Sequence, residues 1–232
     1  MTWKRNQKIK YPYNLQYTGP IPKPRKSTSW SNSTYDKIKK EIKKHHSIFQ
    51  DNKCAYCRLP INFGGYGEPI EHIVPKSHKV FWMFHPKNLC LSCYGCNTKK
   101  SDKEVLNNTH KAYSGAYKMY PKNGNDFVIA HPHYDNYSKH IEIKGIICVP
   151  KNDSSKGAKT IEVCKLNRLD LLHKRVLQNR YSRKKINEIY MQKLRDTSTP
   201  KYEIESISNY AKKIAENYNY RRKVLNASKN NS

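Results

Sequence analysis

Four cysteines, arranged as two Cys-x-x-Cys pairs, form the clearest chemical pattern in this sequence. The first pair is Cys54 and Cys57, and the second pair is Cys93 and Cys96. Four thiolates with this spacing satisfy the tetrahedral coordination of Zn²⁺ and leave no position open for a substrate. The pattern therefore predicts a structural zinc site, which would tie the two ends of the segment together and replace part of a hydrophobic core.

The other three cysteines are not expected to bind metal. Cys90 lies three residues before Cys93 and is an alternative ligand by spacing. We favour Cys93, because Cys90 belongs to an alternating apolar run that predicts a buried strand residue. Cys148 and Cys164 are interpreted as ordinary small apolar residues.

A histidine and two hard-ligand side chains lie in or beside the segment that the cysteines enclose. Glu71 and Asn97 offer a carboxylate and an amide oxygen, which suit Mg²⁺ or Mn²⁺. A neutral His72 imidazole can take a proton from a water that attacks phosphorus. The chain before His72 and residues 88–92 are strand-like, and the chain from Asn97 onward is helix-like. Folding strand, strand and helix over one zinc would bring the three side chains to one surface.

With these residues, the segment from about 54 to 103 resembles the HNH (ββα-metal) endonuclease family. The family signature runs Cys-x-x-Cys, Asp/Glu-His-Ile-x-Pro, Asn, and Cys-x-x-Cys-Asn-x-x-Lys. Between and after its cysteine pairs, this chain supplies Glu71-His72-Ile73-Val74-Pro75, Asn88 and Asn97-Thr98-Lys99-Lys100. The resemblance implies an α+β fold with a zinc-stapled ββα-metal core. It also implies an enzyme that hydrolyses phosphodiester bonds in DNA and leaves 5′-phosphate and 3′-hydroxyl ends.

The resemblance also assigns roles to single residues. It makes His72 the general base, Glu71 and Asn97 the ligands of the catalytic Mg²⁺ or Mn²⁺, and Asn88 a brace for the loop that holds His72. One departure is that position 71 is Glu, where the family more often has Asp. Because the extra methylene displaces the carboxylate by about 1.5 Å, ligation through a water is an alternative. The residues expected to contact nucleic-acid phosphates are Lys76, Lys99 and Lys100.

Each of these residues also has a purely structural interpretation. His72 could be a buried histidine without chemistry, Asn97 a helix cap, and Asn88 a turn residue. His78 and His85 fit no part of the signature, so we interpret them as surface or local packing residues.

The composition favours a polyanionic partner. The chain has 232 residues, and 45 Lys and Arg against 18 Asp and Glu give a net charge of +27. Such a field attracts nucleic acid, because bound phosphates release their counterions. No apolar segment resembles a signal peptide or a membrane span. Unpaired cysteines at metal-site spacing suggest a reducing, cytoplasmic location.

We expect three regions. The secondary-structure pattern predicts a helix over 34–50, strands over Phe127–Ala130 and Ile141–Val149, helical structure from about residue 158, and a second helix from near Thr199. The regions are a flexible basic arm (1–33), the HNH nuclease domain (34–126) and an accessory region with strands and a mostly helical end (127–232).

The first 30 residues contain four prolines, interleaved aromatic residues and no acid. This composition suits either a strap that follows phosphates and stacks on bases, or an arm whose aromatic side chains dock on the body.

A second histidine group consists of His131, His133, Asp135 and His140. We expect it to be a structural brace, with metal binding as the alternative. Together with Lys165, Asn167, Arg168 and Arg180, the group also resembles the HNH nucleases of Septu-type and retron-associated anti-phage systems. That resemblance implies an ATPase partner, which would dock on the helical C-terminal region.

Two other functions fit the same residues. A non-catalytic zinc-dependent nucleic-acid-binding module needs only the cysteines and the charge. An HNH enzyme that cuts RNA needs the same catalytic block, because that block contacts phosphate rather than base.

Overall fold

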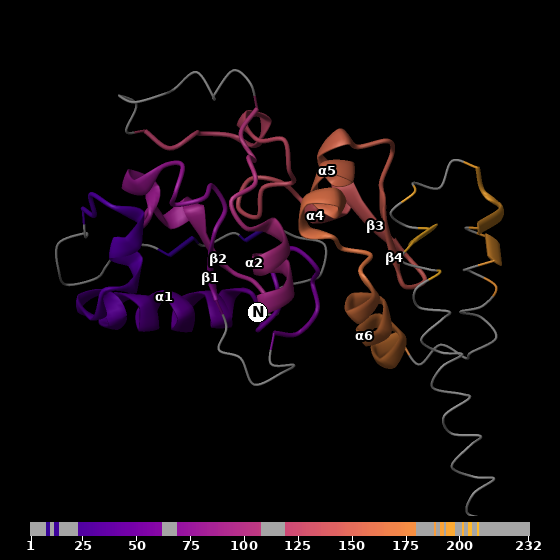
Figure 1. Ribbon diagram of the computed structural model, residues 1–232, viewed down its shortest axis with the longest axis horizontal. Helices are drawn as coiled ribbons and strands as arrows, with labels where there is room; N and C mark the ends of the chain where they lie inside the picture. The colour runs from indigo at the N-terminus through magenta and orange to yellow at the C-terminus, as the bar shows by residue number, and fades with distance from the viewer. Residues whose placement is uncertain are drawn as a thin grey trace, which may run out of the picture. The chain divides into compact units, whose positions relative to one another are not determined.

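The computed structural model describes residues 8–9, 12–13, 23–61, 69–107 and 119–179, with a few separate residues between 188 and 208. Two short antiparallel strand pairs and several helices form the described part of the fold (Figure 1). The α-helices are α1 (Asp36–Phe49), α2 (Tyr94–Lys100), α4 (Tyr137–His140), α5 (Ser155–Cys164) and α6 (Leu169–Asn179), and the strands are β1 (Ile70–His72), β2 (Leu89–Leu91), β3 (Ile141–Lys144) and β4 (Ile147–Pro150). Short 3₁₀ helices cover Ser27–Ser31, Ser33–Tyr35, Val80–Trp82, Pro86–Asn88 and Gly124–Asp126.

Two compact units are present. One comprises Met1–Lys144 with Cys148–Leu166, and the other comprises Gly145–Ile147 with Asn167–Ser232. This division does not follow the expected boundary between residues 126 and 127. The chain just after that boundary belongs to the first unit, where the His133 Nε2 atom lies 2.7 Å from the Leu89 carbonyl oxygen.

The second unit contains α6, where Arg175 Nη1 donates to the Ile146 carbonyl at 3.0 Å. Arg180 and nearly all of the second expected helix, which starts near Thr199, lie outside the described residues. No helix among the described residues is long and apolar enough to cross a membrane.

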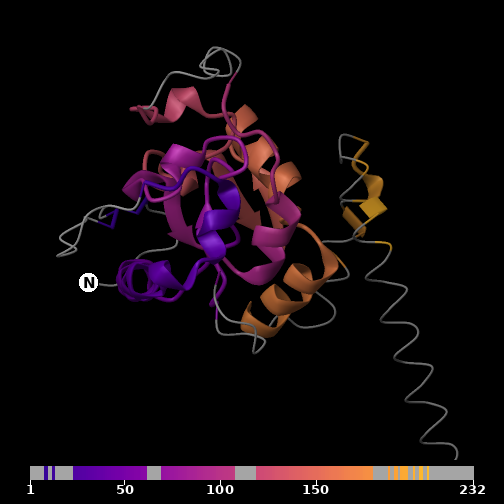
Figure 2. The same cartoon turned by 60° about the vertical axis from the view of Figure 1, so that its left-hand side comes forward.

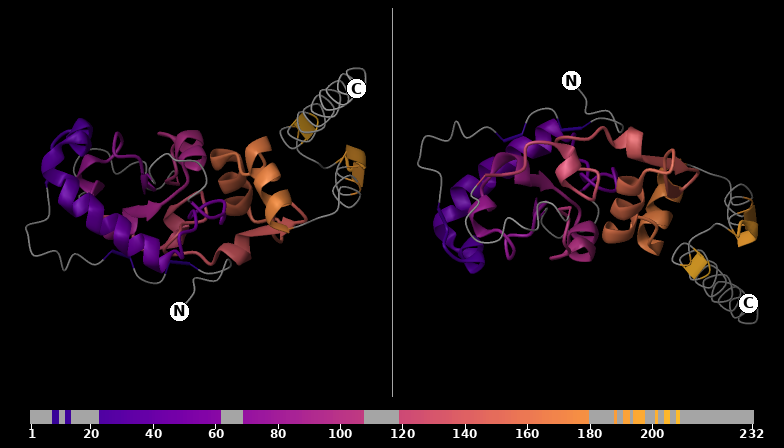
Figure 3. Two further views of the ribbon diagram at one scale, coloured as in Figure 1. Left: turned by 90° about the horizontal axis from the view of Figure 1, so that it is seen from below. Right: turned by 90° about the horizontal axis from the view of Figure 1, so that it is seen from above.

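Helix α1 packs on the β1–β2 pair through one apolar face. Ile38, Ile42 and His46 are buried along it, and the helix lies within the range predicted from the sequence. After the helix, the buried side chain of Gln50 accepts from the Leu91 N–H at 2.8 Å and donates to the Leu91 carbonyl at 3.0 Å. Because one amide meets both backbone groups of a strand residue, α1 is fixed in position along β2. Figure 2 and Figure 3 follow the indigo-to-magenta run from α1 to α2 from other directions.

The strand–strand–helix order expected in the cysteine-bounded segment is present. β1 pairs antiparallel with β2, with His72 opposite Leu89, and both strands are buried throughout. Helix α2 begins at Tyr94, three residues before the expected start at Asn97. It begins there because Cys93 occupies the N-cap position, and its Sγ accepts a hydrogen bond from the Cys96 N–H at 3.4 Å.

Two predictions for the accessory region are wrong in detail. Phe127–Ala130 is not a strand: Phe127 makes only an isolated bridge, and the Ala130 N–H bonds to the Thr160 hydroxyl at 2.8 Å instead of to a strand. The run Ile141–Val149 is divided into β3 and β4 by a turn at Gly145, whose φ of 65° favours glycine.

The predicted helical stretch after residue 158 is interrupted. Lys165 adopts a left-handed conformation that ends α5, and α6 starts four residues later.

The N-terminal arm is docked where it is described. Ile9 and Tyr13 are buried. The Ile9 N–H donates to the Pro132 carbonyl at 2.8 Å, and the Tyr13 hydroxyl donates to Glu41 Oε2 at 3.2 Å. The prediction of a flexible arm is therefore wrong at Ile9 and Tyr13. At these two positions the alternative, an arm docked on the body, is correct. Most of the other residues before Lys23 lie outside the described residues.

Candidate metal centre and catalytic cavity

The four predicted zinc ligands meet at one point. The Sγ atoms of Cys54, Cys57, Cys93 and Cys96 all lie within 4.8 Å of one another, and the cluster is largely buried. The four sulfurs are close enough to bind a single ion, so the prediction of four cysteines able to hold a structural metal is confirmed. Cys90 lies in β2 and is not part of the group.

Local backbone bonds form the turn that presents the first cysteine pair. The Arg58 N–H donates to the Cys54 carbonyl at 3.1 Å, and the Ala55 N–H donates to the Leu91 carbonyl at 3.0 Å. Arg58 completes the turn with a positive φ of 61°. Hydrogen bonds from Cys54 and the other thiols hold the pKa of Cys93 well below its usual range. Burial raises the pKa of Cys54 and hydrogen bonds from the other thiols raise that of Cys96, so Cys93 is the cysteine of this group that is held as a thiolate, the form that binds a cation.

A cavity of about 670 Å³ is lined by residues of α1, β1 and α2, including Asn97, which directly follows Cys96 in the chain. Three of the predicted catalytic residues, Glu71, His72 and Asn97, line it together, and so does Lys76. The side chain of Asn97 is partly exposed there, and its alternative role as a helix cap is wrong because Cys93 is the N-cap of α2. The charged and aromatic lining residues that the sequence did not assign to this site are Trp30, Asp36, Lys39, Lys40, Lys43 and Asp102.

His72 is held as a neutral imidazole with a defined tautomer. Its Nε2 atom lies 3.1 Å from the Met83 carbonyl oxygen, and since a carbonyl can only accept, Nε2 carries the hydrogen. The Nδ1 atom is therefore left with its lone pair. The Trp30 ring lies against the imidazole edge-to-face, with 4.5 Å between centroids. Burial, helped by the charge of Lys76, lowers the pKa of His72 to about 3.

Glu71 is engaged by a buried lysine. Its Oε1 atom lies 2.7 Å from Lys100 Nζ and accepts a hydrogen bond from the Tyr56 hydroxyl at 3.1 Å. Burial raises the pKa of Glu71, and the positive charge of Lys100 opposes that rise. Lys100 Nζ also donates to the His72 carbonyl at 3.0 Å.

The position of Lys100 corrects one prediction. The residue is fully buried, so it does not reach a phosphate, and its interactions are with Glu71 and His72. Lys99 is exposed on α2 but is not among the residues that line the cavity.

Asn88 cross-links the loop that follows β1. Its Oδ1 accepts from the Val74 N–H at 2.7 Å, and its Nδ2 donates to the carbonyls of Val74 and Trp82, each at 3.1 Å. Trp82 immediately precedes Met83, whose carbonyl holds His72. The amide therefore couples both ends of the loop to the position of the imidazole.

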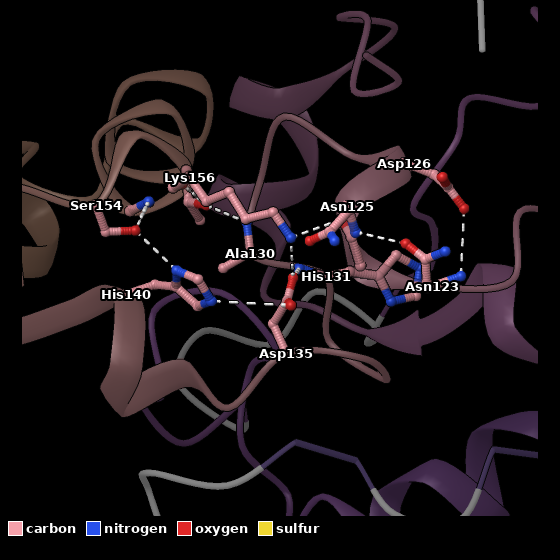
Figure 4. A network of polar contacts seen from close by, with 12 residues as sticks. Asn123, Asn125, Asp126, Ala130, His131, Asp135, His140, Ser154 and Lys156 are labelled. Carbon is pink, nitrogen blue, oxygen red and sulfur yellow. Dashed lines mark hydrogen bonds and ion pairs between the residues drawn. The ribbon is translucent and has the colours of Figure 1, made fainter. Parts of the chain in front are cut away.

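His131, Asp135 and His140 of the second histidine group belong to a polar network rather than to a cluster of metal ligands (Figure 4). Asp135 accepts from the His131 N–H at 2.8 Å and pairs with Lys156 at 2.9 Å. His140 Nδ1 lies 2.7 Å from the Ser154 hydroxyl, which caps α5. These contacts fasten α5 to the segment after residue 130. Within the described part of the chain, the four cysteines are the only group of three or more potential metal ligands.

The two other histidines between the cysteine pairs, His78 and His85, make local contacts. His85 stacks on Tyr120 with 4.3 Å between ring centroids, and His78 lies 3.7 Å from Glu104.

The chain matches no protein-family model, and no curated protein or solved structure is significantly similar to it.

Proposed function

We propose that this protein is a metal-dependent endonuclease of the HNH type that hydrolyses phosphodiester bonds in DNA. One observation carries the proposal: a neutral histidine, a carboxylate and an amide line the same lysine-bearing cavity, and the amide residue, Asn97, directly follows Cys96 of the four-cysteine cluster. The order β1, β2, α2, with the second cysteine pair at the start of α2, supports a ββα-metal core. The resemblance of residues 54–103 to the HNH signature supports the choice of reaction.

His72 is the general base in this proposal. Its Nδ1 atom removes a proton from water while the water oxygen forms a bond to phosphorus. The bond from phosphorus to the 3′ oxygen then breaks, and the leaving oxygen takes a proton from solvent. The products are a 5′-phosphate and a 3′-hydroxyl. The Met83 carbonyl holds the hydrogen on Nε2, so Nδ1 keeps its lone pair and is ready to accept a proton.

Glu71 and Asn97 are the residues that would hold a catalytic Mg²⁺ or Mn²⁺. Lys100 and Tyr56 both bond to Oε1 of Glu71, which leaves Oε2 as the oxygen for a ligand or for a bridging water. A carboxylate and an amide oxygen are the ligand types that these ions prefer. When bound, the ion supplies stabilisation of the negative charge that develops on the phosphate and on the leaving oxygen.

Cleavage of plasmid DNA with Mg²⁺ tests this function. We expect His72→Ala to lower the cleavage rate by about 10²–10⁴-fold, the usual contribution of a general base. His78→Ala is the matched control, because His78 is exposed, lies in the loop that follows β1 and does not line the cavity. If both variants cut as well as the parent protein, the assignment of His72 is wrong.

The two alternative functions give different results in the same assay. A non-catalytic zinc module would bind DNA without any effect of Mg²⁺, and an RNA-cutting enzyme would cleave a matched RNA in preference to DNA. We extend the proposal to an ATPase partner docking on the region after residue 127, as the anti-phage resemblance implies. Adding such a partner should be tested wherever the isolated chain is inactive.

A further inference from the structure

One face of α1 forms part of the wall of the cavity that holds His72. Asp36, Lys39, Lys40 and Lys43 all line this cavity. They follow the i, i+3, i+4, i+7 spacing, which places them on a single helix face. The helix lies outside the segment that resembles the nuclease signature, so the cavity combines two separate parts of the sequence.

Two of the cations around the cavity are already neutralised. Lys39 Nζ lies 2.6 Å from Asp36 Oδ1 and also donates to the Trp30 carbonyl at 3.2 Å. Lys100 is paired with Glu71 at 2.7 Å. These two pairs each contribute no net charge to the cavity.

The remaining charges leave the cavity positive. They are Lys40, Lys43 and Lys76 against Asp102, so three positive charges minus one negative charge give a net charge of about +2 at the wall. No hydrogen bond or ion pair joins any of these three lysines to another described residue. Lys40 is exposed, and Lys43 and Lys76 are partly exposed, so their ammonium groups can reach a ligand.

We infer that Lys40 and Lys43 of α1, together with Lys76, bind phosphate groups of one polynucleotide strand on both sides of the bond that faces His72. Lys40 and Lys43 are three residues apart, which is about 4.5 Å along the helix axis. That separation is comparable to the axial spacing of about 3.4 Å per phosphate in one strand. The inference rests on the proposed function only for the position of the scissile bond.

The size of the cavity supports one strand rather than a whole duplex inside it. A volume of about 670 Å³ equals a cube with an edge of about 9 Å. A duplex is wider than its major groove, which is about 12 Å across, so a whole duplex does not enter a space of this size. The sugar-phosphate backbone of a single strand does.

Helix α1 also supplies a matched control. Lys37 and Lys44 are exposed and do not line the cavity, and their spacing of seven residues puts them together on another face. The double variants Lys40→Gln/Lys43→Gln and Lys37→Gln/Lys44→Gln therefore remove the same charge from the same helix. Each would be combined with His72→Ala in the full-length protein, and binding of a fluorescent single-stranded DNA would be measured by anisotropy over a range of NaCl concentrations.

We expect the cavity variant to bind about tenfold more weakly at low salt. A plot of log K against log salt has a negative slope, and this slope should become less steep by about 1.4. That change is about 0.7 for each lost phosphate contact of a single strand. The control variant should change the slope by much less. If the two variants weaken binding equally, only the overall charge matters and the inference is wrong. Unchanged binding in both variants also overturns it.

Two further measurements separate this inference from the proposed function. A matched single-stranded RNA that shows the same dependence on Lys40 and Lys43 supports recognition of the phosphate backbone. Cleavage is measured on the same lysine variants with His72 intact. Binding that depends on these lysines without any cleavage would leave the inference standing and refute the nuclease. If the cavity variant cleaves DNA with an unchanged KM, the nuclease stands and the inference about Lys40 and Lys43 is wrong.

Discussion

Replacing Asn88 with alanine should destabilise the protein strongly. The amide is fully buried and makes three hydrogen bonds to the backbone of Val74 and Trp82. The substitution leaves one N–H and two carbonyls without their partner, and a buried unpaired group costs about 1–3 kcal/mol. We therefore expect the free energy of unfolding to fall by roughly 3–5 kcal/mol, allowing for partial relaxation. For a chain of this length, that loss lowers Tm by about 10 °C.

Urea unfolding followed by circular dichroism measures this change. Asn136→Ala is the control, because Asn136 is exposed and its side chain makes no capping hydrogen bond. We expect the control to change the free energy of unfolding by less than about 0.5 kcal/mol. If Asn88→Ala costs less than about 1 kcal/mol, the loop is held by other contacts, and the link between Asn88 and the position of His72 is wrong.

Two other properties follow from the buried groups. Cys57→Ser should release zinc from the purified protein, as measured by metal analysis, whereas Cys90→Ala should retain it because Cys90 lies outside the cluster. Burial lowers the pKa of His133 to about 4, below its value of about 6.5 in the unfolded chain. The unfolded chain therefore binds the extra proton between these values, so stability should fall by about 1.4 kcal/mol per pH unit as the pH drops from about 6.5 to 4. In His133→Gln, the free energy of unfolding in urea should depend less steeply on pH, because one proton fewer is taken up on unfolding. An unchanged pH dependence would contradict the burial argument.

The sequence by itself determined the features that depend on spacing along the chain. The two cysteine pairs predicted a single cluster because a Cys-x-x-Cys turn places both thiols on one side, and two such turns complete a tetrahedral set. The strand-like segments before His72 and over 88–92 predicted β1 and β2, and the helical pattern over 34–50 predicted α1. Local periodicity alone is sufficient for these elements, because it decides which face of an element is buried.

Only the tertiary structure decided how the charged side chains are used. A lysine on α2 was expected at a phosphate, but Lys100 is buried against Glu71. The sequence assigned no role to the lysines of α1, yet Lys39, Lys40 and Lys43 line the cavity. Of these three, only Lys39 is paired with another described residue, Asp36. Phe127–Ala130 has the composition of a strand, but among the described residues it pairs only through the isolated bridge between Phe127 and Leu106. In each case the outcome depends on contacts between residues far apart in the sequence, and the burial of a charge or the pairing of a strand is a property of those contacts rather than of the local pattern.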